Sequence, residues 1–191
     1  MKPIRAYSIS IALMSLLFVA CSDDPCETQM CHNGGVCIDG LCDCPERFTG
    51  PDCSEQVTPD VMRITSVKLL RFPGFRPNDD KMWDVTDGPD VYFRLMHGDE
   101  PVAQPVVLLE NADHTQQYQF HIGLVDMKTV LDEYTMQLFD YEAIGIEPQL
   151  MGEIAFTPYS TTNGFPTEMV LDNGGPIAFQ VSFEYLYKHV D

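Results

Sequence analysis

The chain has 191 residues, 45% of them hydrophobic and 10% aromatic, which suits one or two small domains with packed cores. Only 11 Lys and Arg residues stand against 29 Asp and Glu, for a formal net charge of −18. Such a charge repels phosphate groups and anionic headgroups, so it argues against nucleic-acid binding through a basic face and favours cations as ligands.

The first twenty residues are typical of an export signal. Two basic residues, Lys2 and Arg5, precede a nearly uncharged apolar run over residues 9–20. That run is too short to cross a bilayer as a helix, which takes about 20 residues. We therefore expect the segment to be removed on export.

Cys21 directly follows this run, and the sequence Leu17-Phe18-Val19-Ala20-Cys21 resembles the lipobox of bacterial lipoproteins, although Phe18 departs from the preferred leucine. The resemblance implies a signal peptide over residues 1–20, a lipid on Cys21, and a tether over residues 21–25 that anchors the chain in the bacterial outer membrane. The acidic residues after Cys21 also resemble a signal for the outer face of that membrane. The alternative is an ordinary cleaved signal with a free cysteine nearby.

Six cysteines follow within residues 26–53, spaced C-x4-C-x5-C-x4-C-x-C-x8-C. A stretch this short cannot bury a useful core, and an exported chain meets an oxidising environment, so we expect disulfides rather than a zinc site. Six cysteines allow fifteen pairings, and spacing alone does not choose among them.

The cysteine spacing, together with Asn33-Gly34-Gly35, Cys44-Pro45, Phe48 and Gly50, resembles an EGF-like module. The resemblance implies three disulfides, Cys26–Cys37, Cys31–Cys42 and Cys44–Cys53. Calcium-binding EGF modules carry a specific acidic set before the first cysteine, and Ser22-Asp23-Asp24-Pro25 does not match it, so we assign no calcium to this module. We expect a spacer, with protein contact as the alternative.

After a polar linker over residues 54–60, residues 61–191 form short runs of alternating apolar and polar residues, separated by Gly, Pro, Asn and Asp. The pattern predicts an all-β domain, an eight-stranded antiparallel β-sandwich. Only residues 124–133 hint at a helix. The expected strands are 62–72, 91–96, 105–109, 118–122, 134–138, 152–156, 168–171 and 177–187.

Two loops of this domain are strongly acidic. Residues 78–90 carry Asp79, Asp80, Asp84, Asp87 and Asp90, and residues 140–147 carry Asp140, Glu142 and Glu147. Neighbouring carboxylates repel one another unless they are solvated or neutralised. Calcium is the natural neutraliser, because it takes six to eight oxygen ligands at flexible distances.

Three segments of the domain resemble a C2 domain: Asp84-x5-Asp90 with the strand that follows, the aromatic strand 118–122, and residues 136–142 with Gly152. The resemblance covers most of residues 61–191 and implies calcium ligand roles for Asp84, Asp90, Asp140, Glu142 and Glu147, with the Tyr141 carbonyl as a neutral ligand. Glutamate at 142 and Pro148 near the expected last aspartate depart from the family, so a single ion is expected. The alternative is a solvated acidic rim without metal.

Apolar residues beside the acids suggest a partner-binding tip. We expect Trp83, Ile144 and Ile146 to form this tip. The C2 resemblance implies that such a tip enters a membrane or contacts a partner once calcium neutralises the loops. The alternative for Trp83 is packing beneath the loop, the commoner fate of a lone tryptophan.

Paired carboxylates also occur in glycosidases, so catalysis is the hypothesis against which binding is weighed. A domain of about 130 residues leaves little room for a substrate cleft, and no Ser, Cys or His motif accompanies the acids. We expect a non-catalytic, surface-anchored protein that binds a membrane, protein or glycan partner in adhesion or surface assembly. The alternative is a carbohydrate-binding β-sandwich whose calcium is at most structural, which an aromatic platform on a sheet face would favour.

Overall fold

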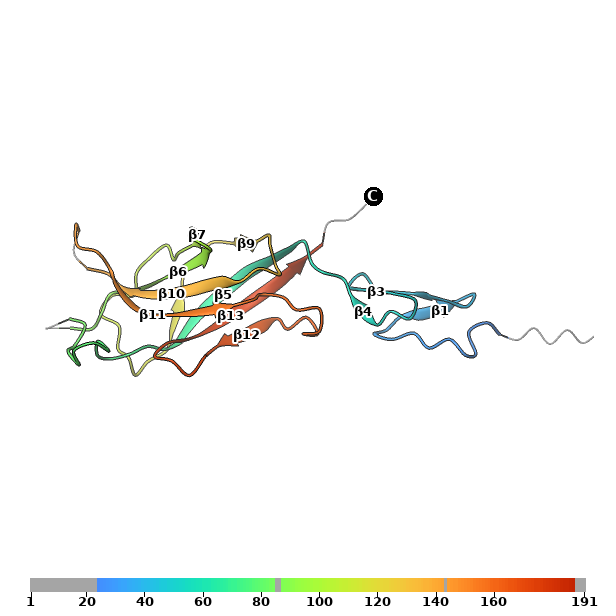
Figure 1. Cartoon of the computed structure of the whole chain (residues 1–191), viewed down its shortest axis with the longest axis horizontal. Coiled ribbons are helices and arrows are strands. Elements are labelled where there is room, and N and C mark those ends of the chain that lie inside the picture. Colours follow the sequence, from blue (N-terminus) through green and yellow to red (C-terminus); the bar gives the residue numbers. More distant parts are fainter. Residues whose placement is uncertain (1–23, 85–86, 143, 188–191) are drawn as a thin grey trace, which may run out of the picture.

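The computed structural model describes residues 24–84, 87–142 and 144–187, and these residues form two modules arranged end to end (Figure 1). The described part of the chain contains strands and turns but no helix, so the expected all-β class is confirmed. It also contains no helix that is long and apolar enough to cross a membrane. Cys21, the signal peptide over residues 1–20 and the first part of the tether lie outside the described residues.

The N-terminal module consists of two small hairpins held by three disulfides. Strand β1 (Val36–Ile38) pairs with β2 (Leu41–Asp43), and β3 (Phe48–Thr49) pairs with β4 (Glu55–Gln56). The disulfides are those that the EGF resemblance implies, Cys26–Cys37, Cys31–Cys42 and Cys44–Cys53. Because β4 belongs to the second hairpin, the module extends past Cys53 and the connection to the next domain is shorter than the linker expected over residues 54–60.

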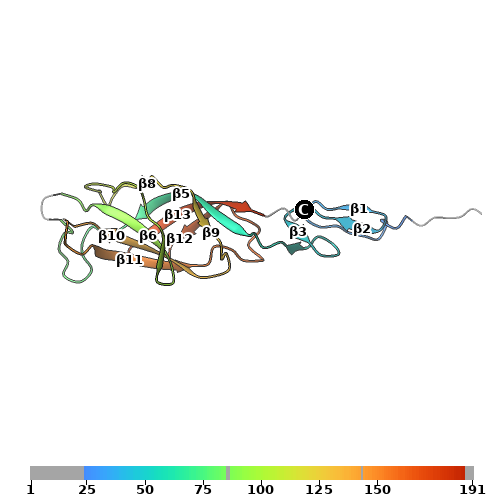
Figure 2. The ribbon, with the colours of Figure 1, turned by 90° about the horizontal axis from the view of Figure 1, so that it is seen from above.

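The C-terminal domain is a sandwich of two antiparallel sheets. Figure 2 shows the two sheets from above, packed face to face. One sheet has the order β11-β10-β6-β7, and the other has the order β12-β13-β5-β8 with β9 also paired to β5. The strands are β5 (Val61–Arg71), β6 (Val91–His97), β7 (Glu100–Ala103), β8 (Tyr118–Phe120), β9 (Val125–Met127), β10 (Tyr134–Asp140), β11 (Gln149–Phe156), β12 (Glu168–Leu171) and β13 (Ala178–Leu186).

The sandwich has nine strands in eight positions. Strand β8 pairs with residues 67–69 of β5, and β9 pairs with residues 62–64, so the two short strands share one edge of β5. Each sheet therefore has four positions, which agrees with the eight-stranded sandwich expected from the alternating pattern.

Two sequence predictions about these strands were wrong. Residues 105–109 make only an isolated bridge through Leu109, because Gly98, with a φ of +57°, turns the chain early and makes 100–103 the return strand beside β6. Residues 124–133 are not helical, because residues 125–127 pair with β5, which buries Met127 completely. Pairing with a distant strand overrides the local preference for helix in this segment.

The core lies between the two sheets and is lined by alternate residues of each strand. In β10, Tyr134, Met136, Leu138 and Asp140 are all buried, whereas the residues between them are partly exposed. Phe93 packs edge-on against Phe120, with ring centroids 5.0 Å apart, and so joins the two sheets. The apolar pattern of β10 thus carries one carboxylate, Asp140, into a core position.

Candidate metal centre

The site begins with Asp140, which ends strand β10 with its side chain on the core face. It is the one charged residue among those described that is fully buried, with 0% exposure. Its Oδ1 accepts a hydrogen bond from the backbone N–H of Asp90 at 3.1 Å, but its Oδ2 has no hydrogen-bond partner. A buried carboxylate oxygen without a partner costs free energy. A bound cation or a hydrogen-bond donor would remove that cost.

The charge on Asp140 is unfavourable in the metal-free protein. Burial raises the pKa of this carboxyl to about 7, and the nearby negative charges of Asp84, Glu142 and Asp90 add to the rise. The backbone hydrogen bond from Asp90 opposes the rise. Burial, followed by the charges of Glu142, Asp87 and Asp90, also raises the pKa of Asp84. These carboxylates are therefore close enough to repel one another.

A close backbone approach holds the first acidic loop against the segment that follows Glu110. A Cβ atom added to Gly88 would lie 2.5 Å from the carbonyl oxygen of Ala112, a distance that no side chain tolerates. Beside it, the N–H of Ala112 donates to the Pro89 carbonyl at 2.8 Å, and the N–H of Asn111 donates to Oδ1 of Asp90 at 2.9 Å. Glycine at position 88 therefore allows the two loops to meet and positions Asp90.

A cavity of about 470 Å³ opens between the loops, and it is lined almost wholly by oxygen-bearing side chains. The second acidic loop reaches it just after β10, where Oε1 of Glu142 accepts a hydrogen bond from Nε2 of Gln149. The lining residues are Asp84, Asp87, Asp90, Glu110, Asn111, Tyr141 and Glu142.

The structure brings together four of the five expected ligands. Asp84, Asp90 and Glu142 line the cavity, and Asp140 adjoins it through its bond to Asp90. Glu147 is exposed and does not line the cavity, so its expected place in the ligand set is wrong. Pro148 follows it directly, and strand β11 begins at the next residue.

Glu110 and Asn111 line the cavity although the sequence patterns did not indicate them. They occupy a third loop whose place beside Asp90 depends on the backbone contact at Gly88. A single Glu-Asn pair carries no spacing signal, so only the fold could place it here. Among the described residues, no three His, Cys, Asp or Glu side chains are already arranged to hold a metal ion together.

Two of the three residues of the expected apolar tip are exposed. Ile144 and Ile146 are 96% and 58% exposed on the second acidic loop. Trp83 is only 6% exposed, packs with the sandwich core, and donates its Nε1–H to the Pro73 carbonyl at 2.8 Å. The expected contact of Trp83 with a partner is therefore wrong. The indole ring is buried in the core and its N–H already has a hydrogen-bond partner inside the protein.

Trp83 is the chain's single tryptophan, so its fluorescence reports this packing directly. We expect the emission to stay unchanged when phosphatidylserine-containing vesicles and calcium are added, because the ring is already buried. In a Trp83→Phe, Ile144→Trp variant, the new indole replaces a 96% exposed side chain and its emission should move to the blue if the tip enters lipid. A vesicle-induced shift in the parent protein would contradict the buried position of Trp83.

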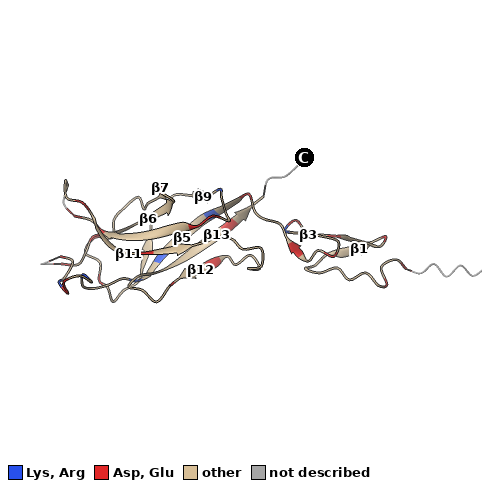
Figure 3. Ribbon diagram, in the orientation of Figure 1, with Lys and Arg blue, Asp and Glu red and all other residues tan. Residues whose placement is uncertain are grey.

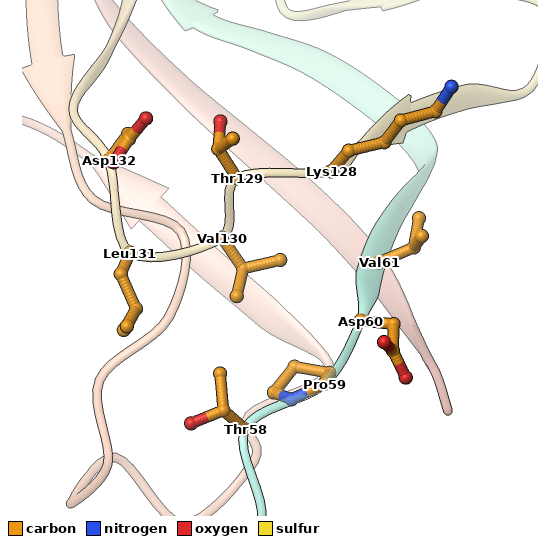
Figure 4. A pocket seen from close by; sticks show the side chains of 9 residues that line it. All are labelled: Thr58, Pro59, Asp60, Val61, Lys128, Thr129, Val130, Leu131 and Asp132. Atoms are coloured by element: carbon orange, nitrogen blue, oxygen red, sulfur yellow. The ribbon is translucent and has the colours of Figure 1, made fainter. Parts of the chain in front are cut away.

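A larger cavity, about 640 Å³, lies at the other end of the sandwich, between the connection from the first module and residues 128–132. Figure 4 shows that the side chains of Asp60 and Lys128 at its rim point in different directions, and that Leu131 points away from both. Polar groups that do not converge give no recognisable ligand geometry. The acidic cavity is therefore the better candidate for a ligand site. It lies at the end of the sandwich farthest from the first module, and Figure 3 shows acidic residues on the loops there.

No family model matches the chain. Curated proteins match it over single-module lengths. The EGF-like repeat and discoidin I-like domain-containing protein 3 of Mus musculus is 48% identical over 51 residues, 22% of this chain and 11% of that protein. Protein crumbs homolog 2 of Homo sapiens is 45% identical over 40 residues, covering 19% and 3%, and the cubilin homolog of Caenorhabditis elegans is 50% identical over 36 residues, covering 17% and 1%. The chain thus spans about a tenth or less of the length of these relatives.

Two similar solved structures are C2 domains. One, described as the structure of a C2 domain, has a TM-score of 0.41 at 11% identity, over 65% of this chain and 97% of that one. A C2 domain of plant extended synaptotagmin 1 has a TM-score of 0.41 at 12% identity, over 70% and 99%. At these values the likeness bears on neither ligand nor mechanism. The chain joins a disulfide-rich EGF-like module to an antiparallel β-sandwich of the kind that the sequence predicts.

Proposed function

We propose that this is a non-catalytic binding protein whose acidic loops bind calcium and present the far end of the sandwich to a partner. The observation that carries the proposal is the unpartnered Oδ2 of Asp140, which is fully buried and feels the negative charges of Asp84, Asp90 and Glu142. A cation at this position would satisfy the orphaned oxygen and cancel the repulsion that raises the pKa of Asp140.

The chemistry of the donors suits calcium. The cavity walls offer carboxylate and amide oxygens from three loops and no thiol or imidazole, and hard oxygen donors at variable distances are what calcium takes. Asp84, Asp90, Asp140 and Glu142 would hold the ion. Because no three of the described acids are already in ligand positions, binding requires their side chains to turn inward, and calcium would supply the charge that makes this favourable.

The apolar residues beside the acids indicate what kind of partner this end would meet. Ile144 and Ile146 project from the loop that carries Glu142, and Phe75 and Met82 are 54% and 52% exposed on the neighbouring turn of the first acidic loop. Apolar side chains around an acidic cavity fit a lipid or protein surface that is approached once the loop charge is neutralised. With a lipid on Cys21 anchoring the other end in the bacterial outer membrane, the protein would act in adhesion or surface assembly.

The test is thermal unfolding of the whole chain with millimolar calcium, with magnesium, and with chelator. Calcium at one hundred times its dissociation constant adds about 2.7 kcal/mol, which raises the melting temperature by several degrees for a domain of this size. Asp84→Asn should lose most of this shift, because Asp84 lines the cavity. The matched control is Asp99→Asn, an exposed aspartate in the turn between β6 and β7, which should keep the full shift.

An equal shift with magnesium, or none with calcium, would leave the acids as a solvated rim and remove the basis of this function. A shift that Asp84→Asn retains and Asp99→Asn loses would place the ion elsewhere.

One observation favours the second candidate, a carbohydrate-binding sandwich. On the outer face of the β11-β10-β6-β7 sheet, the rings of Tyr92 and Phe139 stack with centroids 5.4 Å apart, Arg94 lies 4.7 Å above Phe139, and Tyr141 is 37% exposed at the edge. Three of these residues, Tyr92, Arg94 and Tyr141, line a cavity of about 410 Å³, although Tyr92 is only 6% exposed. The other lining residues are Gln104, Pro105, Val106, Leu108 and Pro148. A sugar bound there would need no calcium, so glycan binding that persists in chelator distinguishes this candidate from the first.

A further inference from the structure

We propose that the EGF-like module and the sandwich form one rigid body in solution, because the sandwich carries an aromatic socket that receives the Phe48 turn of the module. The socket consists of Tyr159, Phe165 and Tyr185. Phe48 packs against the sandwich core cluster, and its ring meets that of Phe165 edge-on, with centroids 5.7 Å apart and planes at 83°. The guanidinium of Arg47, next to Phe48, lies 5.9 Å from the Phe165 ring centroid.

Contacts within the sandwich hold the three rings of the socket. Phe165 stacks on Tyr159 at 5.8 Å and packs edge-on against Tyr185 at 5.4 Å, and the hydroxyl of Tyr185 donates to the Pro166 carbonyl at 2.6 Å. These rings come from strand β13 and from the connection between β11 and β12. Because Tyr159 and Tyr185 both contact the Phe165 ring, that ring offers a fixed surface to Phe48.

The backbone of Phe165 supports the same inference. Its φ is +57°, a left-handed conformation that a bulky aromatic residue rarely adopts, although only 9% of the residue is exposed. The conformation is held by a hydrogen bond from the N–H of Phe165 to Oδ1 of Asn163 at 3.1 Å. Such conformations persist where the surrounding contacts hold the residue in place. Here Phe48 of the module and the other two rings of the socket contact the ring of Phe165.

Hydrogen bonds close the joint beside the rings. The N–H of Val57 donates to the Arg47 carbonyl at 2.9 Å, and the hydroxyl of Tyr159 donates to the Val57 carbonyl at 3.3 Å. The side-chain amide of Gln56, in strand β4 of the module, fits best with its nitrogen donating to the Thr161 carbonyl at 3.2 Å and its oxygen accepting from Gly164 N at 3.0 Å. Both modules and their connection thus take part, and little chain is left to act as a hinge.

With a rigid joint, the expected spacer module would act as a strut, a support of fixed length and direction. Figures 1 and 2 show the module at one end of the elongated pair and the acidic loops at the other. The strut would hold the acidic loop end at a constant reach and orientation relative to the module. This inference does not depend on whether the loops bind calcium, and its test is run in chelator.

The test is the distance between two spin labels in the whole chain, measured by double electron–electron resonance. The labels are attached through unnatural amino acids at the exposed positions Ile38 in the module and Leu124 in the sandwich, which leaves the disulfides intact. We expect one narrow distance distribution in the parent protein and a distribution several-fold wider in Phe48→Ala. A wide distribution in the parent protein would overturn the proposal.

The matched control is Leu41→Ala, which removes an apolar side chain of the same module that is 75% exposed, and it should leave the distribution narrow. If Phe48→Ala fails to fold, as judged by near-ultraviolet circular dichroism, Phe165→Leu decides, because it keeps apolar volume while it removes the ring contacts. A narrow distribution in a folded Phe48→Ala or Phe165→Leu variant would show that the aromatic socket does not hold the modules together.

Discussion

Asp140→Asn is expected to stabilise the calcium-free protein at pH 8 and to flatten the fall of its stability between pH 4 and pH 8. The pKa of Asp140 is about 7 in the folded protein and 3.8 as the ordinary value of the unfolded chain. The folded state therefore holds a proton that the unfolded state releases, so this group's contribution is full below pH 4 and is lost as the pH rises through 7. The shift corresponds to an upper limit of about 4 kcal/mol.

Asparagine removes the charge and keeps the useful contact. Its side-chain oxygen still accepts the hydrogen bond from the N–H of Asp90, and its amide nitrogen takes the place of the unpartnered Oδ2 beside Asp84 and Glu142. Urea unfolding in chelator at pH 5 and pH 8 measures the effect, with Asp99→Asn as the exposed control. Equal pH dependence in the parent and Asp140→Asn proteins would contradict the burial of this charge.

With calcium present, Asp140→Asn should be less stable than the parent protein, the reverse of its effect in chelator. The proposed ion uses the negative charge of Asp140, so the parent protein gains stability with calcium and Asp140→Asn gains little. A general change in packing would not both raise the stability in chelator and abolish the stability gained from calcium in one variant. Stabilisation in both conditions would mean that Asp140 is a buried carboxyl with no ligand role.

The residues that sequence reasoning placed correctly are those whose surroundings are local. Alternation along 134–140 carries four side chains to the core face and places Asp140 beneath the acidic loops, where it bonds to Asp90. The EGF-like cysteine spacing implied the disulfides that the structure contains. The alternation fixes which side chains of the strand share a face. The spacing of six cysteines alone leaves fifteen pairings open, and the family resemblance is what selected the correct one.

The residues that sequence reasoning missed depend on contacts between distant segments. Trp83 lies within the first acidic loop in the sequence, but its ring packs with the core and its N–H bonds to the Pro73 carbonyl. Glu110 joins the cavity only because Gly88 lets two loops touch. Phe48 matched the EGF-like pattern of its own module, and its partner Phe165 lies far along the chain in a connection without a motif. Long-range packing of this kind leaves no periodic trace in the sequence.

Removing the Cys44–Cys53 disulfide is expected to release the joint between the modules as well as to destabilise the first one. This bridge closes the loop that carries Arg47 and Phe48, and its buried Cys53 has 0% exposure. In the chain-entropy model, removing a disulfide that closes a loop of this length lowers the free energy of unfolding by about 2.6 kcal/mol. Replacing both cysteines by alanine should therefore lower resistance to denaturant and widen the distance distribution between labels at Ile38 and Leu124.

The Cys26–Cys37 bridge provides the matched control, because it spans 11 residues against 9 and so has nearly the same expected entropic cost. Its loop does not contain Phe48, and its double alanine variant should lose similar stability while the distance distribution stays narrow. If both variants widen the distribution equally, the joint depends on the integrity of the whole module. If only the Cys44–Cys53 variant widens it, the small loop around Phe48 is what couples the module to the sandwich, and that disulfide sets the reach of the acidic end.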